Sequence, residues 1–268
     1  MFIEERHQAI LALLNEMGSI STADIQRRFG VGYDSAKRDL RILEEKGLLK
    51  RTHGGAISLD QAAFGRGART APRETSDADP ERLAIAESAA SLIRENDVIF
   101  LQASQEGMLL AQKLSRETHM RVVTNSIPLA DLLKKRENAS VMLIGGEVDG
   151  DGCCFDSFAL DMLKRLRFDK CFITSEGLSA GFGLSVGASG RVAFLDGVIG
   201  ASRRVIGLYR SEKLGADSAI SICPAEKLDC VITDRRADAD ESSSETAGAV
   251  SELREFGISV VIADGTGE

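Results

Sequence analysis

The chain contains few of the residues that build metal centres and disulfide frameworks. Its 268 residues include three histidines and five cysteines, and no two cysteines are spaced as C-x-x-C. Cys153 and Cys154 are adjacent, but a zinc site needs further ligands at suitable spacing. Buried or partly buried thiols in a reducing compartment explain this odd set better. We therefore expect no metal and no cofactor.

Long apolar runs and targeting segments are also absent. No run approaches the roughly 20 apolar residues that cross a bilayer, and the charges at Glu4, Glu5 and Arg6 are unlike a signal peptide. The length suffices for a small domain plus one of roughly 180 residues. We expect a cytoplasmic protein that has no membrane partner.

Basic residues are outnumbered by acidic ones over the whole chain, but they are concentrated in one stretch. The formal net charge is -8, which disfavours nonspecific nucleic-acid binding if it is spread evenly. A basic surface between residues 35 and 51 would give affinity through phosphate contacts. The alternative is a solvated helix laced with ion pairs, since Arg41 and Glu45 are four residues apart. In this stretch Lys37, Arg38, Arg41, Lys46, Lys50 and Arg51 outnumber Asp39, Glu44 and Glu45.

Residues 31–56 combine a basic helix with a basic hairpin. Ala36, Leu40 and Leu43 recur with helical spacing, which predicts a helix over residues 33–46 with one apolar face. Residues 48–52 and 56–58 predict two short strands joined by a turn at residues 53–55. This hairpin would form a wing.

Two further helices precede the basic one. Ile10, Leu14 and Met17 mark an amphipathic first helix. Ser21 or Thr22 can cap a second helix that ends at residue 29. Glycines at residues 30 and 32 suit the turn between the second helix and the third. Three helices and a wing predict a winged helix-turn-helix DNA-binding domain over residues 2–58.

Helices and strands alternate in the rest of the chain. Residues 59–80 are polar and rich in Gly, Arg and Pro, which is typical of a linker. The alternation predicts a larger, doubly wound α/β domain over residues 81–268, with a largely parallel sheet covered on both faces. The polar residues 234–246 are predicted to form a surface loop. Strands are predicted at 98–101, 121–124, 141–144, 170–174, 204–208, 230–233 and 259–263, and helices at 81–94, 109–114, 128–135, 157–166, 192–201 and 247–256.

Polar and glycine clusters follow three of the predicted strands, at residues 124–126, 145–147 and 211–213. Ligands of parallel sheets bind at the carboxyl ends of the strands. Backbone amides with hydroxyl and amide side chains suit an anion, and Lys213 could supply the counter-charge. Each cluster also has a purely structural explanation, because Asn and Ser cap helices and glycines turn loops. Their joint placement at strand ends favours a pocket.

Several short runs point to one family. Residues 38–40 (Arg-Asp-Leu), 43–47 (Leu-Glu-Glu-Lys-Gly) and 51–56 (Arg-Thr-His-Gly-Gly-Ala) resemble the DNA-binding domain of the DeoR family of bacterial transcriptional regulators. Residues 81–263 resemble the family's sensor domain, which is related in fold to ribose-5-phosphate isomerase. The resemblance implies a domain that binds phosphorylated sugars or related metabolites and thereby weakens operator binding. The matching runs of the sensor domain are residues 124–126, 145–146, 168–172 and 232–234.

Residues 102–107, Gln-Ala-Ser-Gln-Glu-Gly, depart from the family pattern, which usually has an Asp, a small residue, a Gly and two Thr that hold the phosphate. Glu106 would repel a phosphate, and two lost hydroxyl donors remove bonds worth about 1.5 to 3 kcal/mol each.

Two hypotheses about the effector follow. In the first, the effector differs from the family's usual one: it is uncharged, or it binds in the opposite orientation with Arg210 as the partner of its anionic group. In the second, sensing is lost and the domain mainly holds an oligomer together. We favour a changed effector, because glutamines suit hydroxyl groups. The candidate effector-binding residues are Gln102, Ser104, Gln105, Glu106, Asn125, Ser126, Gly145, Gly146, Arg210 and Lys213.

Catalysis is the main rival function. Sugar isomerisation needs a positioned base and an electrophile, and Glu106, Glu147 and Asp169 are available carboxylates. However, such carboxylates are common at loop ends, and no Ser-His-Asp order, P-loop or G-x-G-x-x-G after a first strand is present. A third possibility is an architectural DNA-binding protein without an effector. We expect that the protein is not an enzyme.

The sequence thus predicts a DNA-binding transcriptional regulator, and a repressor on resemblance alone. The helix at residues 33–46 would enter a major groove, while the wing touches the backbone or the minor groove. The expected partners are double-stranded operator DNA, a sugar, polyol or sugar phosphate, and further copies in a homodimer or homotetramer, because two heads on repeated half-sites multiply affinity. The candidate DNA-binding residues are Tyr33, Ser35, Lys37, Arg38, Arg41, Lys50, Arg51, Thr52 and His53.

Overall fold

The structure, a computed structural model, describes residues 6–11, 13, 19–46, 48–52, 55–57, 79–238 and 245–264. The chain divides into two compact units, Met1–Arg69 and Thr70–Glu268. Leu14, Met17, His53 and nearly all of the predicted linker lie outside the described residues.

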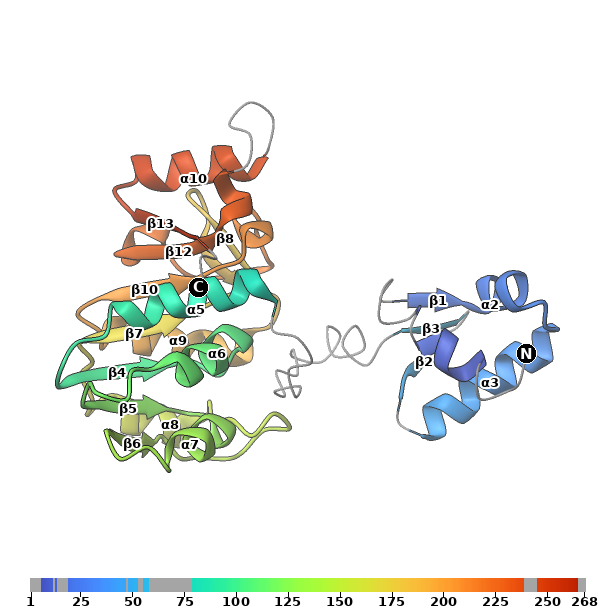
Figure 1. Cartoon of the computed structure of the whole chain (residues 1–268), viewed down its shortest axis with the longest axis horizontal. Helices are drawn as coiled ribbons and strands as arrows, with labels where there is room; N and C mark the ends of the chain where they lie inside the picture. Colours follow the sequence, from blue (N-terminus) through green and yellow to red (C-terminus); the bar gives the residue numbers. More distant parts are fainter. Residues whose placement is uncertain are drawn as a thin grey trace. The chain divides into compact units, whose positions relative to one another are not determined.

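The smaller unit combines helices with a three-stranded sheet (Figure 1). Residues 6–11 are helical, and α2 (Thr22–Phe29) and α3 (Tyr33–Glu45) follow. β2 (Lys50–Thr52) and β3 (Gly55–Ile57) pair antiparallel as the predicted wing, and β1 (Ser19–Ser21) pairs with the other side of β3. The prediction of a winged helix-turn-helix is confirmed. Its core contains Ile10, Ile20, Ile25, Ala36, Leu40, Leu43, Leu49 and Ala56.

β1 is missing from the sequence prediction. It has three residues, of which only Ile20 is apolar, and it pairs with a strand that comes much later in the chain. Ser21 both ends β1 and caps α2, because its Oγ accepts a hydrogen bond from Asp24 N at 3.0 Å while Asp24 Oδ2 accepts one from Ser21 N at 3.4 Å. This reciprocal pair is a capping box, and it identifies Ser21 rather than Thr22 as the cap.

A seven-stranded parallel sheet forms the centre of the larger unit, in the order β13-β12-β10-β7-β4-β5-β6 (Figure 1). The chain adds strands outward from β4 to β6, returns to β7 beside β4, and then continues outward on the other side. The strand order therefore reverses between β4 and β7, the place where such sheets bind ligands. The strands are β4 (Asp97–Leu101), β5 (Met120–Thr124), β6 (Ala139–Leu143), β7 (Lys170–Ile173), β10 (Val205–Leu208), β12 (Cys230–Asp234) and β13 (Ser259–Ala263).

Helices cover both faces of this sheet. Successive side chains of one strand enter opposite cores, so Ile99 of β4 packs in one core and Phe100 in the other. Burial on both faces explains why the strands are almost continuously apolar, and the doubly wound prediction is confirmed. One core includes α5 (Pro80–Ser91), α6 (Gln105–Lys113) and α7 (Ile127–Leu133), and the other includes α8 (Ser157–Leu163), α9 (Val192–Gly200) and α10 (Glu245–Glu255).

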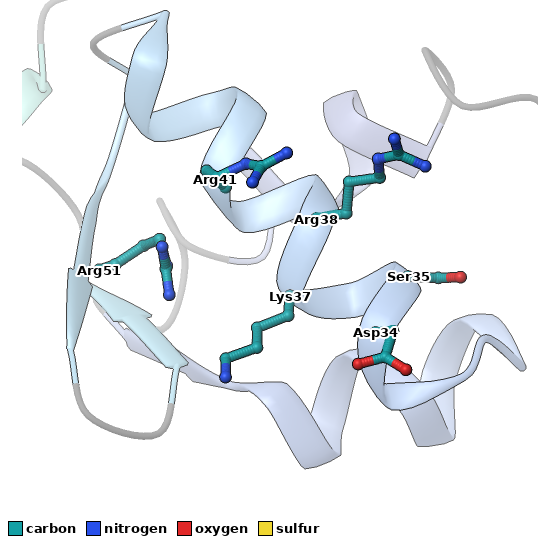
Figure 2. A pocket seen from close by; sticks show the side chains of 6 residues that line it. All are labelled: Asp34, Ser35, Lys37, Arg38, Arg41 and Arg51. Atoms are coloured by element: carbon teal, nitrogen blue, oxygen red, sulfur yellow. The ribbon is translucent and has the colours of Figure 1, made fainter.

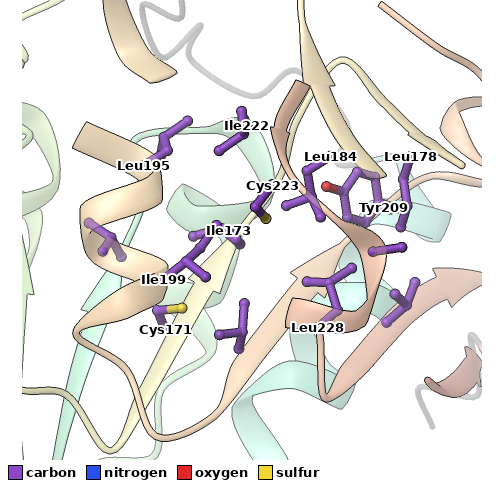
Figure 3. Close-up of a cluster of buried hydrophobic side chains, with 14 of the residues drawn as sticks. Cys171, Ile173, Leu178, Leu184, Leu195, Ile199, Tyr209, Ile222, Cys223 and Leu228 are labelled. Atoms are coloured by element: carbon purple, nitrogen blue, oxygen red, sulfur yellow. The ribbon is translucent and has the colours of Figure 1, made fainter. Parts of the chain in front are cut away.

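The larger unit also contains a second, antiparallel sheet that the sequence prediction lacks. It consists of β8 (Gly177–Ser179), β9 (Gly183–Val186) and β11 (Ile220–Cys223), in the order β11-β9-β8. Strands of three or four residues are too short to show a clear alternation, and glycines open two of them. Figure 3 shows Ile222 of β11 in the same core as Leu195 and Ile199 of α9.

Two further predictions are wrong. α6 begins at Gln105 instead of residue 109, because Ser104 caps it. Asp234 is fully buried at the end of β12 and not in a surface loop. Its carboxylate accepts hydrogen bonds from Ser211 N at 2.8 Å and from Arg236 N at 3.1 Å, so it joins two turns inside the fold.

All five cysteines are buried and free of disulfides, as predicted. Burial raises the pKa of Cys153 to about 11 and the pKa of Cys171 to about 12. They are protonated thiols that pack as small apolar side chains.

Candidate functional site

The exposed side of α3 and the strand β2 form an open groove in the smaller unit. Its volume is about 550 Å³, and Figure 2 shows its six lining side chains. Four of these side chains are cations and one is a carboxylate, so the groove is strongly positive. The lining residues are Asp34, Ser35, Lys37, Arg38, Arg41 and Arg51, and all except Asp34 are predicted DNA-binding residues.

Helical periodicity creates this separation of faces. Ala36, Leu40 and Leu43 point into the core and are at most 1% exposed. Lys37, Arg38 and Arg41 lie on the other side of the helix and are exposed. Tyr33 is 52% exposed, and Lys37 Nζ lies 5.3 Å from the centroid of its ring. This cation–π contact holds the lysine along the exposed side of α3.

The wing is attached to the end of α3 through Glu44. Arg51 N donates a hydrogen bond to Glu44 Oε1 at 2.9 Å, and the Arg51 guanidinium lies 3.9 Å from Glu44 Oε2. The backbone of Lys50 and Thr52 belongs to β2, but their side chains, like His53, lie outside what the structure describes. Asp39 is 3% exposed and faces inward, so it does not reduce the positive charge of the groove.

The carboxyl ends of β4 and β7 bring together the first part of a second candidate site. Gln102 Oε1 accepts a hydrogen bond from Thr174 N at 2.7 Å, which joins the two strand ends where the strand order reverses. Ser104 Oγ accepts one from Gly107 N at 2.9 Å and so caps α6. A Cβ atom at Gly107 would lie 2.2 Å from the Gln102 carbonyl oxygen, so only glycine allows this close approach. Gln105 is exposed at the start of α6.

Lys213 and Glu106 bring opposite charges to this edge. Lys213 Nζ lies 3.4 Å from Thr174 Oγ1, and within the described part of the chain no carboxylate is within salt-bridge distance of it. Burial lowers the pKa of Lys213, and the charge of Glu106 partly opposes this. Glu106 is 2% exposed and forms an ion pair with Arg82. Because Arg82 balances its charge, Glu106 is a weaker obstacle to an anionic ligand than the sequence indicates.

Asn125 and Ser126 lie at the end of the neighbouring strand, β5. Asn125 is 1% exposed and donates a hydrogen bond from Nδ2 to the Cys154 carbonyl oxygen at 2.9 Å. Its buried Oδ1 has no hydrogen-bond partner among the described residues, which leaves an acceptor for a ligand hydroxyl or a water. Ser126 Oγ accepts a hydrogen bond from Leu129 N at 3.3 Å and caps α7.

The glycine pair after β6 is fastened to the start of α8. Gly146 has a φ of +157°, and a Cβ atom there would lie 2.3 Å from Asp156 Oδ1. The Asp156 carboxylate accepts hydrogen bonds from Glu147 N at 2.6 Å and from Ala159 N at 2.9 Å. Gly145 and Gly146 therefore shape a loop, and the structure gives no contact between them and Lys213.

Arg210 is occupied by carboxylates. Its guanidinium lies 3.0 Å from Asp79 Oδ2 and 3.0 Å from Glu81 Oε2. These ion pairs do not favour the hypothesis in which Arg210 holds an anionic effector group.

The sequence prediction did not include Thr174 or Arg82 among the site residues. Thr174 could have been found, because it lies at the carboxyl end of a predicted strand, where ligands of parallel sheets bind. No local sequence pattern marks Arg82.

Comparison with known protein families identifies both units. A model of the DeoR-like helix-turn-helix domain matches residues 6–62, and a model of the DeoR C terminal sensor domain matches residues 78–235. The chain belongs to the DeoR family. It therefore combines a DNA-binding head with a sensor domain for a small molecule.

Individual relatives are similar over most of the chain. The HTH-type transcriptional repressor GlcR of Bacillus subtilis is 32% identical over 88% of this chain and 90% of its own length. The lactose phosphotransferase system repressor of Staphylococcus epidermidis is 31% identical over 86% and 91%. Among solved structures, ribose 5-phosphate isomerase A of Methanocaldococcus jannaschii is 16% identical, with a TM-score of 0.37 over 49% of this chain and 52% of that one.

None of the helices that the described residues form is both long and apolar enough to span a membrane. No group of three or more His, Cys, Asp or Glu side chains in this part of the chain is arranged to hold a metal ion.

Proposed function

We propose that the protein represses transcription by binding operator DNA through α3 and the wing, and that it releases the DNA when the larger unit binds a carbohydrate-derived effector. The observation that carries the proposal is the positive groove, to which α3 contributes Lys37, Arg38 and Arg41 and β2 contributes Arg51. Similar proteins are named repressors. Residues 2–58 would read the DNA, residues 59–80 would link the units, and residues 81–268 would sense the effector.

In this proposal α3 lies in the major groove. Arg38 presents a planar guanidinium that suits guanine or phosphate oxygens, while Lys37 acts as a point charge. Arg51 and the wing contact the DNA backbone or the minor groove. A chain with net charge -8 then meets DNA mainly with this one surface.

Genomic footprinting of the full chain would identify the operator, and gel-shift titration would then compare variants. Arg38→Ala should weaken operator binding by about 10-fold or more, as expected for loss of one good base contact or phosphate contact. Lys164→Ala removes one exposed positive charge just after the end of α8 and should leave affinity unchanged. Equal affinities of wild type and Arg38→Ala across a salt titration would contradict the role given to α3.

For the effector we propose a sugar, polyol or sugar phosphate bound at the ends of β4, β5 and β7. Gln102, Ser104, Thr174 and Asn125 offer hydroxyl and amide groups for hydroxylated ligands, and Lys213 offers a cation. A thermal-shift screen tests the changed-effector hypothesis. Stabilisation by neutral sugars or polyols supports it, whereas stabilisation by sugar phosphates alone contradicts it. No response to any compound favours a domain that has lost sensing.

We further propose that the protein is a cytoplasmic regulator without catalytic activity. Glu106, a buried carboxylate beside the proposed pocket, is ion-paired with Arg82 and is therefore poorly suited to act as a base. Turnover of any sugar phosphate in an isomerase assay would contradict this.

We also propose a homodimer or homotetramer, because two DNA-binding units that read two half-sites multiply affinity. Light scattering of the free protein would give the number of copies.

A further inference from the structure

The N-cap and first turn of α5 carry three charged side chains that contact three segments at the carboxyl edge of the sheet. These are Asp79, which caps the helix by accepting a hydrogen bond from Glu81 N at 3.1 Å, then Glu81, and then Arg82. α5 is also the first element that the structure describes after the segment leading from the DNA-binding unit. Within the described part of the larger unit, the start of α5 is therefore the closest in sequence to the DNA-binding unit.

Arg82 links this turn to the first turn of α6. It forms an ion pair with Glu106, whose side chain is 3% exposed. Glu106 lies in the first turn of α6, directly after the loop of Gln102 and Ser104 that is proposed to line the effector pocket. The Glu106 carboxylate is shielded from water, whereas the Arg82 side chain is 21% exposed. At the buried carboxylate the local dielectric is low, so a new charge or hydroxyl beside it would change the strength of the ion pair.

Arg210 links the same turn to the segment that carries Lys213. Its guanidinium binds Asp79 and Glu81 at 3.0 Å each, and the 3-10 turn that follows it, Ser211–Lys213, ends at Lys213. Arg236 Nε also lies 2.5 Å from Glu81 Oε1. Asp234 holds the two segments together through Ser211 N and Arg236 N, so they behave as one support for the start of α5.

We propose that the first turn of α5 transmits effector binding to the DNA-binding unit. An effector that engages Lys213 or the start of α6 changes the surroundings of Glu106 and of the turn after Arg210, and both hold α5 by ion pairs. If a contact to the effector differs between two arrangements of α5, the effector binds these arrangements with different affinities. Such a difference is required for effector binding to be coupled to DNA binding. The inference rests on the proposed function and adds the route by which the two units communicate.

The test breaks the link from the pocket side in the full-length protein. Glu106→Gln removes the negative charge that holds Arg82. Hydrogen exchange of the amides of residues 81–84 should then become about tenfold faster, and operator affinity should change by about tenfold. The matched control is Glu87→Gln, which removes an ion pair with Lys113 between the same two helices at 2.7 Å. The control should leave both exchange at the start of α5 and operator affinity unchanged.

Further variants separate relay from simple damage. Arg82→Gln breaks the same link from the other side and should reproduce the effect, and the exchanged pair Arg82→Glu with Glu106→Arg should restore part of it. Thermal unfolding shows which variants are folded. A folded Glu106→Gln or Arg82→Gln variant with unchanged exchange or unchanged operator affinity overturns the relay. A wild-type chain that binds no specific DNA site overturns the proposed function instead.

Discussion

Arg6 donates two hydrogen bonds to Asp39, from Nε to Oδ2 at 2.7 Å and from Nη2 to Oδ1 at 3.1 Å. His7 Nε2 lies 3.1 Å from the same carboxylate. The Arg6 pKa is raised, first through this hydrogen bond, although burial opposes the rise. Asp39 thus fastens the first helical segment to the inner side of α3, while its neighbour Arg38 faces the groove on the outer side.

Replacing Asp39 by Ala should destabilise the smaller unit. The change leaves a largely buried guanidinium without its partner, so we expect the free energy of unfolding of this unit to fall by about 3 kcal/mol. Urea denaturation followed by circular dichroism measures the change. Asp34→Ala is the control, because Asp34 is exposed in the groove. It should change stability little and strengthen DNA binding, since it removes the only carboxylate among the groove's described lining residues. Equal stability of the two variants would contradict the anchoring role.

The groove could be predicted because the residues that form it lie close together in the sequence. Lys37, Arg38 and Arg41 follow from helical periodicity around Ala36 and Leu40, and Arg51 comes shortly afterwards in the predicted wing. The parallel sheet was predictable for a similar reason, because each buried strand is a short apolar run. The second sheet was not, because strands of three or four residues leave too little alternation to recognise.

The contacts of the sensor domain depend on pairs that are distant in sequence. Gln102 and Thr174 are 72 residues apart, and Arg210 and Glu81 are 129 residues apart. The sequence placed Arg210 near Lys213 but could not show that two carboxylates already bind it. It likewise assigned an unbalanced charge to Glu106, because the partner Arg82 lies on an earlier helix. Such pairings are set by topology and leave no local pattern.

Gln102→Leu should weaken the sensor domain at the point where strand order reverses. Leucine keeps much of the side-chain volume but leaves Thr174 N, a buried donor, without its acceptor. We expect a loss of about 1–3 kcal/mol in the free energy of unfolding, measured by urea denaturation. Gln105→Leu, three residues later and exposed at the start of α6, serves as the control and should cost much less. A Gln102→Leu variant as stable as this control would argue against a structural bond to Thr174.

Lys213 should make stability depend on pH in the alkaline range. Burial lowers its pKa below the ordinary 10.5, so the unfolded chain binds this proton more tightly than the folded chain. The resulting loss of stability is fully present below the lowered pKa, and it is relieved as the pH rises from that value to about 10.5. Wild type should therefore gain stability relative to Lys213→Met across this interval, as measured by urea denaturation of both proteins at several pH values. Thiol and tyrosine titrations occur in both proteins and cancel in the difference. If the difference in free energy of unfolding between wild type and Lys213→Met stays constant with pH, burial does not disfavour the ammonium group of Lys213. Lys164→Met is the control for the loss of an exposed positive charge.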